Sequence, residues 1–298
     1  MLFLNHNLFI PSINAYIDPK YSVDKAIITH AHADHAKPNH RHVLATEDTI
    51  NIMKIRYGEN CAKNFQIIKY GERIYLDGIY ITLFPAGHIL GSAQILLEKK
   101  DYKILVTGDY KTISDKTSQK FELVKTNTLV TEATFGLPIF CHPNPVEETK
   151  KIIHSLKSKP QSNHLIGAYS LGKAQRIISI LRELGYLKHI YLHGSMIKIN
   201  NYYLNKKINL GRYTQINKDN VNSLKGEIIL APPSALKDVW SRKISNKVIG
   251  LASGWMNIKQ RAKQKLIELP IIVSDHADWN ELTKTIKDTE AEKVLITH

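Results

Sequence analysis

Three histidines lie within six residues, in the segment THAHADH at positions 29–35, directly after a short apolar run. In an extended segment, residues i and i+2 share a face, so His30 and His32 offer two imidazoles to one metal ion. Asp34 and His35 follow where the chain turns, and we expect them to face a second ion. Neutral imidazoles with carboxylates suit zinc, and manganese and iron are the alternative metals. A histidine-rich surface loop is the competing interpretation.

Two metal ions need more ligands than four side chains supply, and further candidates stand at the ends of other apolar runs. They are His88 in PAGH, Asp109 in VTGD and His298 in VLITH. Each of them alone also fits a loop residue that only makes hydrogen bonds. Together with the first four residues, they complete a set of seven ligands for two ions.

Apolar runs of strand length recur along the chain and are followed by turn-forming or polar residues. The expected strands cover residues 25–29, 79–84, 104–107, 128–131, 164–168, 227–230, 247–251, 271–274 and 293–297. Helices are expected after the N-cap candidate Asn144 and between Gly172 and Gly185. This alternation predicts an α/β protein. Helix and strand alternate most regularly between about residues 145 and 245, which indicates a second unit.

The composition excludes several classes of protein. The chain has 298 residues, a hydrophobic fraction of 43% and a formal net charge of +14, so it has enough apolar residues for a substantial core. Its two cysteines, Cys61 and Cys141, give neither a disulfide framework nor a thiolate metal site, which fits a cytoplasmic protein. We expect no signal peptide and no membrane span, because no apolar run approaches the roughly 18 residues that a span needs. The basic charge favours a polyanionic partner such as nucleic acid, and genomic base composition is the alternative explanation.

The ordered motifs resemble those of metallo-β-lactamase-fold hydrolases, in which a strand-end Asp, here Asp18, precedes HxHxDH, a later His, a bridging Asp and a final His. The chain is more similar to the β-CASP nucleases of that fold, because Glu132 in TEAT and His276 in SDHADW match two of their added motifs. The strings AGHILGSAQ, GKAQR, APPSA and SGWM resemble most closely the bacterial DNA-ligase-associated exonucleases. The resemblance runs in order from Asp18 to His298.

This resemblance implies an α/β fold, namely a metallo-β-lactamase αββα sandwich with an inserted β-CASP cap. We expect residues 1–140 to form the first part of the sandwich, residues 141–250 the cap, and residues 251–298 the return to the sandwich. The chain stops on His298, where the resembling proteins continue. We therefore expect a truncated chain or a natural variant whose second metal site binds weakly.

The resemblance also implies a role for each ligand. Two divalent ions, zinc or manganese, are assigned the following residues: His30, His32 and His88 for one ion, Asp34, His35 and His298 for the other, and Asp109 as the bridge. Two such ions share a water, lower its pKa and clamp a phosphate oxygen, so that the bridging hydroxide attacks the phosphodiester. Asp34 and Asp109 are then catalytic residues, and Asp18 orients ligand histidines without binding metal.

Further residues are expected to serve the leaving group and the substrate. His276 is the expected general acid for the leaving O3′, with Glu132 hydrogen-bonded to it, and a phosphate-binding or structural histidine is the alternative. A helix is expected to begin at Gly172-Lys173, and its start is a candidate phosphate site with the side chains of Ser170, Lys173 and Ser274. The alternative is that the residues at the helix start only cap the helix.

The leading hypothesis is a metal-dependent phosphodiester hydrolase. By resemblance it is a DNA exonuclease of repair or end processing that is functionally associated with a DNA ligase and a helicase. An RNA endo- or exonuclease of the RNase J or mRNA-processing type is the alternative within the same fold. The inserted segment disfavours a small-molecule metallohydrolase, and the retained metal positions disfavour an inactive nucleic-acid-binding scaffold.

Overall fold

The chain folds as two compact units in the computed structural model, which describes residue 4 and residues 7–297. Unit 1 comprises residues 1–139 and 276–298, and unit 2 comprises residues 140–275. The first boundary lies one residue from the expected one. The chain was expected to return to the first unit at residue 251, but it does so only at His276. The reason is that β15 (Lys247–Ala252) and β16 (Leu269–Ile271) both pair within the sheet of unit 2.

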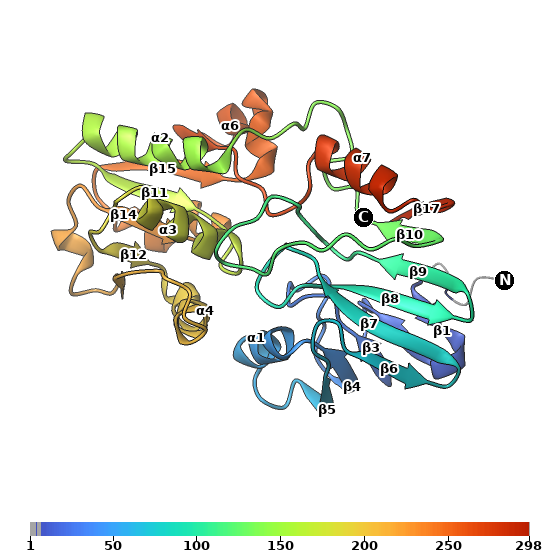
Figure 1. Ribbon diagram of the computed structural model, residues 1–298. Helices are drawn as coiled ribbons and strands as arrows, with labels where there is room; N and C mark the ends of the chain where they lie inside the picture. The colour runs from blue at the N-terminus through green and yellow to red at the C-terminus, as the bar shows by residue number, and fades with distance from the viewer. Residues whose placement is uncertain (1–3, 5–6, 298) are drawn as a thin grey trace. The chain divides into compact units, whose positions relative to one another are not determined.

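Unit 1 contains two sheets (Figure 1). The first sheet has the order β1-β2-β3-β4-β5, with β1 and β2 antiparallel and the other pairs parallel. Its strands are β1 (Phe9–Ile10), β2 (Ala15–Ile17), β3 (Lys25–Ile27), β4 (His40–Ala45) and β5 (Ala62–Ile67). The second sheet has the order β17-β10-β9-β8-β7-β6, antiparallel from β6 to β9 and parallel from β9 to β17. Its strands are β6 (Arg73–Leu76), β7 (Ile79–Pro85), β8 (Ala93–Lys99), β9 (Tyr102–Val106), β10 (Thr128–Thr131) and β17 (Lys293–Ile296).

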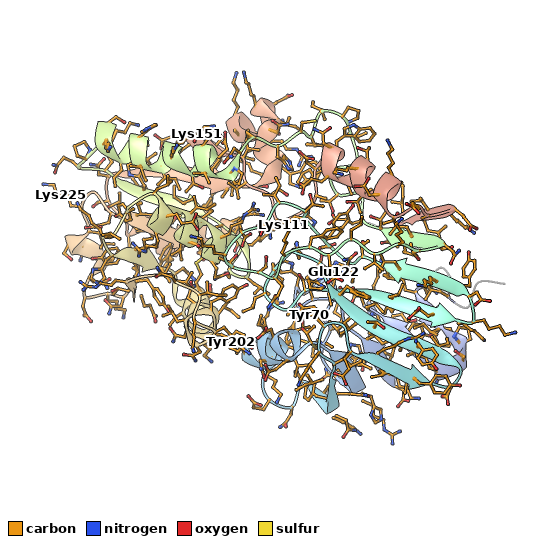
Figure 2. All side chains as sticks on the ribbon, in the orientation of Figure 1. Tyr70, Lys111, Glu122, Lys151, Tyr202 and Lys225 are labelled. Carbon is orange, nitrogen blue, oxygen red and sulfur yellow. The ribbon has the colours of Figure 1, made fainter. Side chains whose placement is uncertain are left out.

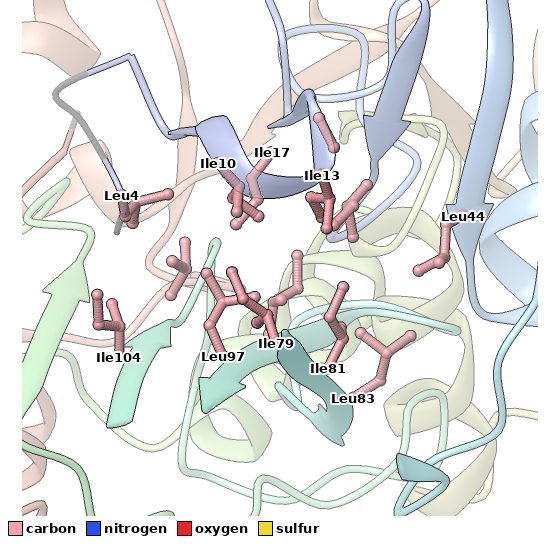
Figure 3. Packing of buried hydrophobic residues seen from close by; sticks show 14 of the residues in the cluster. Leu4, Ile10, Ile13, Ile17, Leu44, Ile79, Ile81, Leu83, Leu97 and Ile104 are labelled. Carbon is pink, nitrogen blue, oxygen red and sulfur yellow. The ribbon is translucent and has the colours of Figure 1, made fainter. Parts of the chain in front are cut away.

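The two sheets of unit 1 pack against each other through one aliphatic core. Alternate residues of a strand point to the same face, and Ile79, Ile81 and Leu83 of β7 all point into this core. Ile17 and Leu44 enter it from the first sheet. Figure 3 shows the two sets of side chains facing each other. Each fully buried aliphatic side chain contributes roughly 1.5–3 kcal/mol, so this core holds the strand ends in place.

Helices flank the two sheets of unit 1. The first helix, α1 (Glu47–Tyr57), packs beside β5. The last helix, α7 (Trp279–Asp288), begins at Asp278, which forms a capping box with Glu281. Ile286 of α7 packs against the face of the second sheet that points away from the aliphatic core. Two packed sheets with flanking helices agree with the expected sandwich.

Unit 2 contains one parallel sheet with the order β13-β12-β14-β11-β15-β16. Its other strands are β11 (Asn163–Gly167), β12 (Ile190–Leu192), β13 (Tyr213–Gln215) and β14 (Ile228–Ala231). Its helices are α2 (Pro145–Ser158), α3 (Lys173–Glu183), α4 (Gly194–Asn205), α5 (Val239–Arg242) and α6 (Lys259–Gln264). The helix that the sequence predicts after Asn144 is confirmed, because the Asn144 side chain accepts a hydrogen bond from the Val146 amide.

The two faces of this parallel sheet are covered unequally. On one face, Ser155 of α2 lies 2.8 Å from the ring of His164 in β11, and α2 also packs against α3. The opposite face carries Leu165 and Leu251, and it is covered by α5, α6 and a 3-10 turn at Pro233–Lys237. These covering helices have only four and six residues.

None of the helices among the described residues has both the length and the apolar surface that crossing a membrane requires.

Candidate metal centre

The candidate metal ligands of unit 1 lie just beyond strand ends. His30, His88 and Asp109 each stand three residues after the last residue of β3, β7 and β9. Glu132 directly follows β10. Polar residues collect here because the strands end and the short loops beyond them bring their side chains together.

Four of these side chains converge on one point. His32 Nδ1 lies 3.2 Å from His30 Nε2 and 3.0 Å from His88 Nε2. Asp109 Oδ2 lies 3.5 Å from His30 Nε2 and 3.7 Å from His88 Nε2. One ligand atom of each residue lies within 4.8 Å of the others. Three imidazole nitrogens with one carboxylate oxygen form a donor set that zinc and similar divalent ions accept, so these residues fit a metal ion.

Burial and neighbouring charges favour the metal-binding forms of two of these groups. Burial, and then His35, hold the pKa of His30 well below its usual range, so this ring is neutral. Burial alone would raise the pKa of Asp109, but His276 and His35 hold it well below its usual range. A neutral imidazole and an ionised carboxylate are the forms that bind metal.

Asp18 holds His35 from the side away from Asp109. Asp18 Oδ2 lies 2.8 Å from His35 Nδ1, and His35 Nε2 lies 3.4 Å from Asp109 Oδ2. Asp18 also accepts hydrogen bonds from the amide and the hydroxyl of Thr29, at 2.8 and 2.5 Å. Burial lowers the pKa of His35, but its hydrogen bonds to Asp109 and Asp18 outweigh burial and raise it to about 11. Asp18 contacts Nδ1 of His35, so the other ring nitrogen, Nε2, points toward Asp109. A residue that orients a metal-binding histidine makes this kind of contact.

The remaining predicted ligands of the second ion are placed differently. The structure does not bring Asp34 into the cluster, since its side chain is 74% exposed and its Oδ2 lies 3.9 Å from His35 Nε2. The reason is the turn at this point, in which the His35 amide bonds to the His32 carbonyl and residue 34 faces outward. His298 lies outside the described residues.

Glu132 and His276 form a pair beside the cluster. Glu132 is buried, and its Oε2 lies 2.8 Å from His276 Nδ1. Its Oε1 accepts the Tyr110 amide at 2.7 Å, which fixes the carboxylate. His276 Nδ1 lies 3.8 Å from Asp109 Oδ2, and its side chain is 23% exposed. The ring therefore borders the cluster and also reaches solvent.

Lys111 is a residue of this site that the sequence interpretation missed. Its side chain, labelled in Figure 2, is 2% exposed. Its Nζ donates hydrogen bonds to the carbonyl groups of Gly87 and His88, the latter at 2.9 Å, and lies 3.0 Å from Asp115 Oδ2. Lysine is almost always exposed, so only its position two residues after Asp109 offered a signal.

Glu281 of α7 is a second residue that the sequence interpretation missed. Its Oε1 accepts hydrogen bonds from the amides of Thr112 and Ile113, at 2.6 and 3.0 Å. These amides belong to the loop that carries Asp109. The first turn of α7 therefore fixes that loop.

The predicted phosphate contacts Ser170, Lys173 and Ser274 belong to unit 2. Lys173 is buried, and its Nζ lies 3.5 Å from Asp275 Oδ2. Arg176 Nη1 lies 3.2 Å from the other oxygen of Asp275 and donates to the Ser274 carbonyl. A buried lysine that is paired with a carboxylate fits the structural alternative at the start of α3. Phosphate binding by the three residues stays a prediction.

No family model matches the chain. Comparison with curated proteins nevertheless finds relatives, which carry different names. A protein named "Probable DNA ligase" from Opitutus terrae is 26% identical over 300 residues, which cover 99% of this chain and 28% of that protein. "RNase aCSPSF2" from Saccharolobus solfataricus is 31% identical over 170 residues, 55% of this chain and 34% of the relative. An "RNase J-like protein" from Methanocaldococcus jannaschii is 29% identical over 212 residues, 61% and 49% of the two chains. This chain thus spans less than half the length of each of these relatives.

Among solved structures, the fold resembles a protein of unknown function from Enterococcus faecalis. The TM-score is 0.61 at 14% identity, and the match covers 94% of this chain and 76% of that one. This likeness concerns the fold alone.

Proposed function

Because the chain belongs to the metallo-β-lactamase-fold β-CASP nuclease family, we propose that it is a metal-dependent phosphodiester hydrolase that cuts nucleic acid, with DNA as its substrate. The observation that carries this proposal is the convergence of buried His30, His88 and Asp109 with half-buried His32, with the Glu132–His276 pair beside it. The net charge of +14 supports a polyanionic substrate.

The proposed cofactor is a pair of divalent ions, zinc or manganese. His30, His32 and His88 would hold one ion and His35 the other, and Asp109 would serve both. Asp34 would join the second ion if its exposed side chain turned toward His35, and His298 is the remaining proposed ligand of that ion. When bound, two such ions supply a water of lowered pKa and neutralise charge on a phosphate.

The protein's own groups orient these ligands and move the proton. Asp18 keeps Nδ1 of His35 occupied, so that Nε2 is the atom presented to a metal. Glu132 holds the Nδ1 proton of His276 and stabilises the charged ring. His276 then donates a proton from its other nitrogen to the leaving O3′.

Two substrate classes fit the relatives. The relative that aligns over nearly the whole chain is named a probable DNA ligase, which supports DNA end processing with a ligase as functional partner. Association with a helicase rests on the family resemblance alone. The shorter matches are named as RNases, and they support RNA cleavage as the second candidate function.

The test is digestion of end-labelled single-stranded DNA, duplex DNA and RNA of one sequence by protein that was stripped of metal and then resupplied with zinc or manganese. We expect DNA cleavage that returns with metal and is lost in Asp109→Asn, whereas the exposed control Asp101→Asn cuts normally. Cleavage of RNA with intact DNA selects the second candidate. A protein that binds metal stoichiometrically and cuts none of the three substrates refutes the nuclease proposal.

A further inference from the structure

A groove opens in unit 2 on the sheet face that only short helices cover. It encloses about 630 Å³ between the 3-10 turn Pro233–Lys237, α5, β15 and the segment that follows α6. Helices of four and six residues are too short to cover strand β15, which explains why the hollow exists. The groove lies entirely within unit 2.

The floor of this groove is aliphatic. Leu236, Ile249, Leu251 and Ile267 line it, and all four belong to or pack against the core cluster of this face. No aromatic side chain is among the described lining residues. Binding of single-stranded nucleic acid relies on aromatic platforms for the bases, so the floor does not favour such a ligand.

The lining is also strongly basic. It includes Lys237, Arg242, Lys247 and Lys265, and no carboxylate belongs to the described lining. Lys247 donates to the carbonyl groups of Ser241 and Ile244, at 2.8 and 3.2 Å, which keeps its charge in place. Four cations around an aliphatic floor are complementary to a ligand that carries carboxylates beside aliphatic groups.

Leu266 on the rim has a conformation that disfavours leucine. Its φ is +55°, and its amide bonds to Lys263 while the next amide, of Ile267, bonds to Ala262. This is the hydrogen-bond pattern of a helix end at which glycine is preferred. Leu266 is nevertheless 75% exposed beside Lys265. An exposed leucine at the mouth of an aliphatic groove extends the apolar surface that a partner could contact.

We propose that this basic groove docks an acidic–aliphatic segment of a partner protein, with leucine-like side chains on the floor and carboxylates against the four cations. Such a segment matches the groove in both charge and hydrophobicity, as amphipathic peptides match the grooves that bind them. The groove is a binding surface separate from the chemistry of unit 1, so its test does not depend on nuclease activity.

The test uses the full chain and a fluorescein-labelled peptide of three Asp-Leu-Leu-Asp repeats, followed by fluorescence anisotropy. Leu266→Gly and Lys265→Glu are each expected to weaken binding about tenfold, as loss of an apolar anchor or reversal of a charge does. Leu187→Gly and Lys188→Glu are the matched controls and should bind normally, since Leu187 is 77% exposed next to a lysine elsewhere in unit 2. Leu266→Gly should also keep or raise the melting temperature, because glycine relieves the strained φ.

Several results would overturn the proposal. One is that the two groove variants and their two controls weaken peptide binding equally, which would indicate only a general attraction of the acidic peptide to a basic protein. Another is equal binding of a peptide with serine in place of leucine, or displacement of the labelled peptide by oligothymidylate as readily as by unlabelled peptide. A third is absence of binding of the labelled peptide up to about 1 mM. Sedimentation showing a dimer that Lys265→Glu dissociates would assign the groove to a second copy of the chain instead.

Discussion

Substitution of Glu132 by glutamine should impair proton donation by His276 while leaving the other steps of the proposed phosphodiester cleavage intact. The carboxylate accepts the Tyr110 amide at 2.7 Å and lies 2.8 Å from His276 Nδ1. Glutamine has the same shape but only one acceptor oxygen, so it can satisfy one of these two donors and must turn its amide group toward the other. A hydrogen bond to a charged group contributes about 1.5–3 kcal/mol. At about 1.4 kcal/mol per factor of ten, loss of the bond to charged His276 predicts a roughly 10- to 150-fold lower rate.

The assay compares two leaving groups in the same variants. Cleavage of single-stranded DNA needs a proton for the leaving O3′, whereas bis(p-nitrophenyl) phosphate has a leaving group that departs without one. Glu132→Gln and His276→Ala are expected to lose activity on DNA and to stay within about threefold of the wild type on the activated ester. The control is Glu122→Gln at an exposed glutamate that Figure 2 labels. Equal losses on both substrates, at an unchanged melting temperature, would refute the general-acid reasoning.

Three further predictions concern the groups around the metal ligands. Lys111→Met leaves Asp115, whose side chain is only 10% exposed, without its cation and should lower the free energy of unfolding by about 3 kcal/mol in chemical denaturation. Adding Asp115→Asn should recover part of that loss. Asp18→Asn weakens the hold on His35 and should reduce metal affinity about 10- to 100-fold in calorimetric titration, whereas an unchanged affinity would show that Asp18 does not orient this ligand. Hydrogen bonds raise the pKa of His35 to about 11, so a metal ion that binds its Nε2, as proposed, would have to displace a proton. The association constant measured with a competing chelator should then rise about tenfold per pH unit from about pH 6 to 8. A pH-independent constant would contradict this proton displacement.

The sequence predicts the parts of this protein that follow local rules. The strand at residues 128–131 and the helix after Asn144 are confirmed, because each depends on apolar periodicity or on a capping residue beside it. The clustering of His30 with His32 depends on spacing in one segment, and the structure brings both together with His88 and Asp109.

Features that depend on long-range pairing could not be predicted in the same way. The second boundary between the units was misplaced because β15 and β16 have the same apolar pattern as the strands of unit 1, and only their pairing assigns them to unit 2. Lys111 is buried because carbonyl groups from another loop surround its amino group. Asp34 points outward because of a turn that the spacing of HxHxDH does not reveal.

The closeness of Thr134 and His276 has a consequence for how the chain accommodates unit 2. Thr134 Oγ1 lies 3.4 Å from His276 Nδ1, although unit 2 separates them in the sequence. A short loop would close unit 1 at this point, and insertions are tolerated where two ends of a fold meet. Unit 2 thus occupies a position at which a fold tolerates an insertion. Every described candidate metal ligand belongs to unit 1, so changes within unit 2 would leave the residues of the proposed chemistry in place.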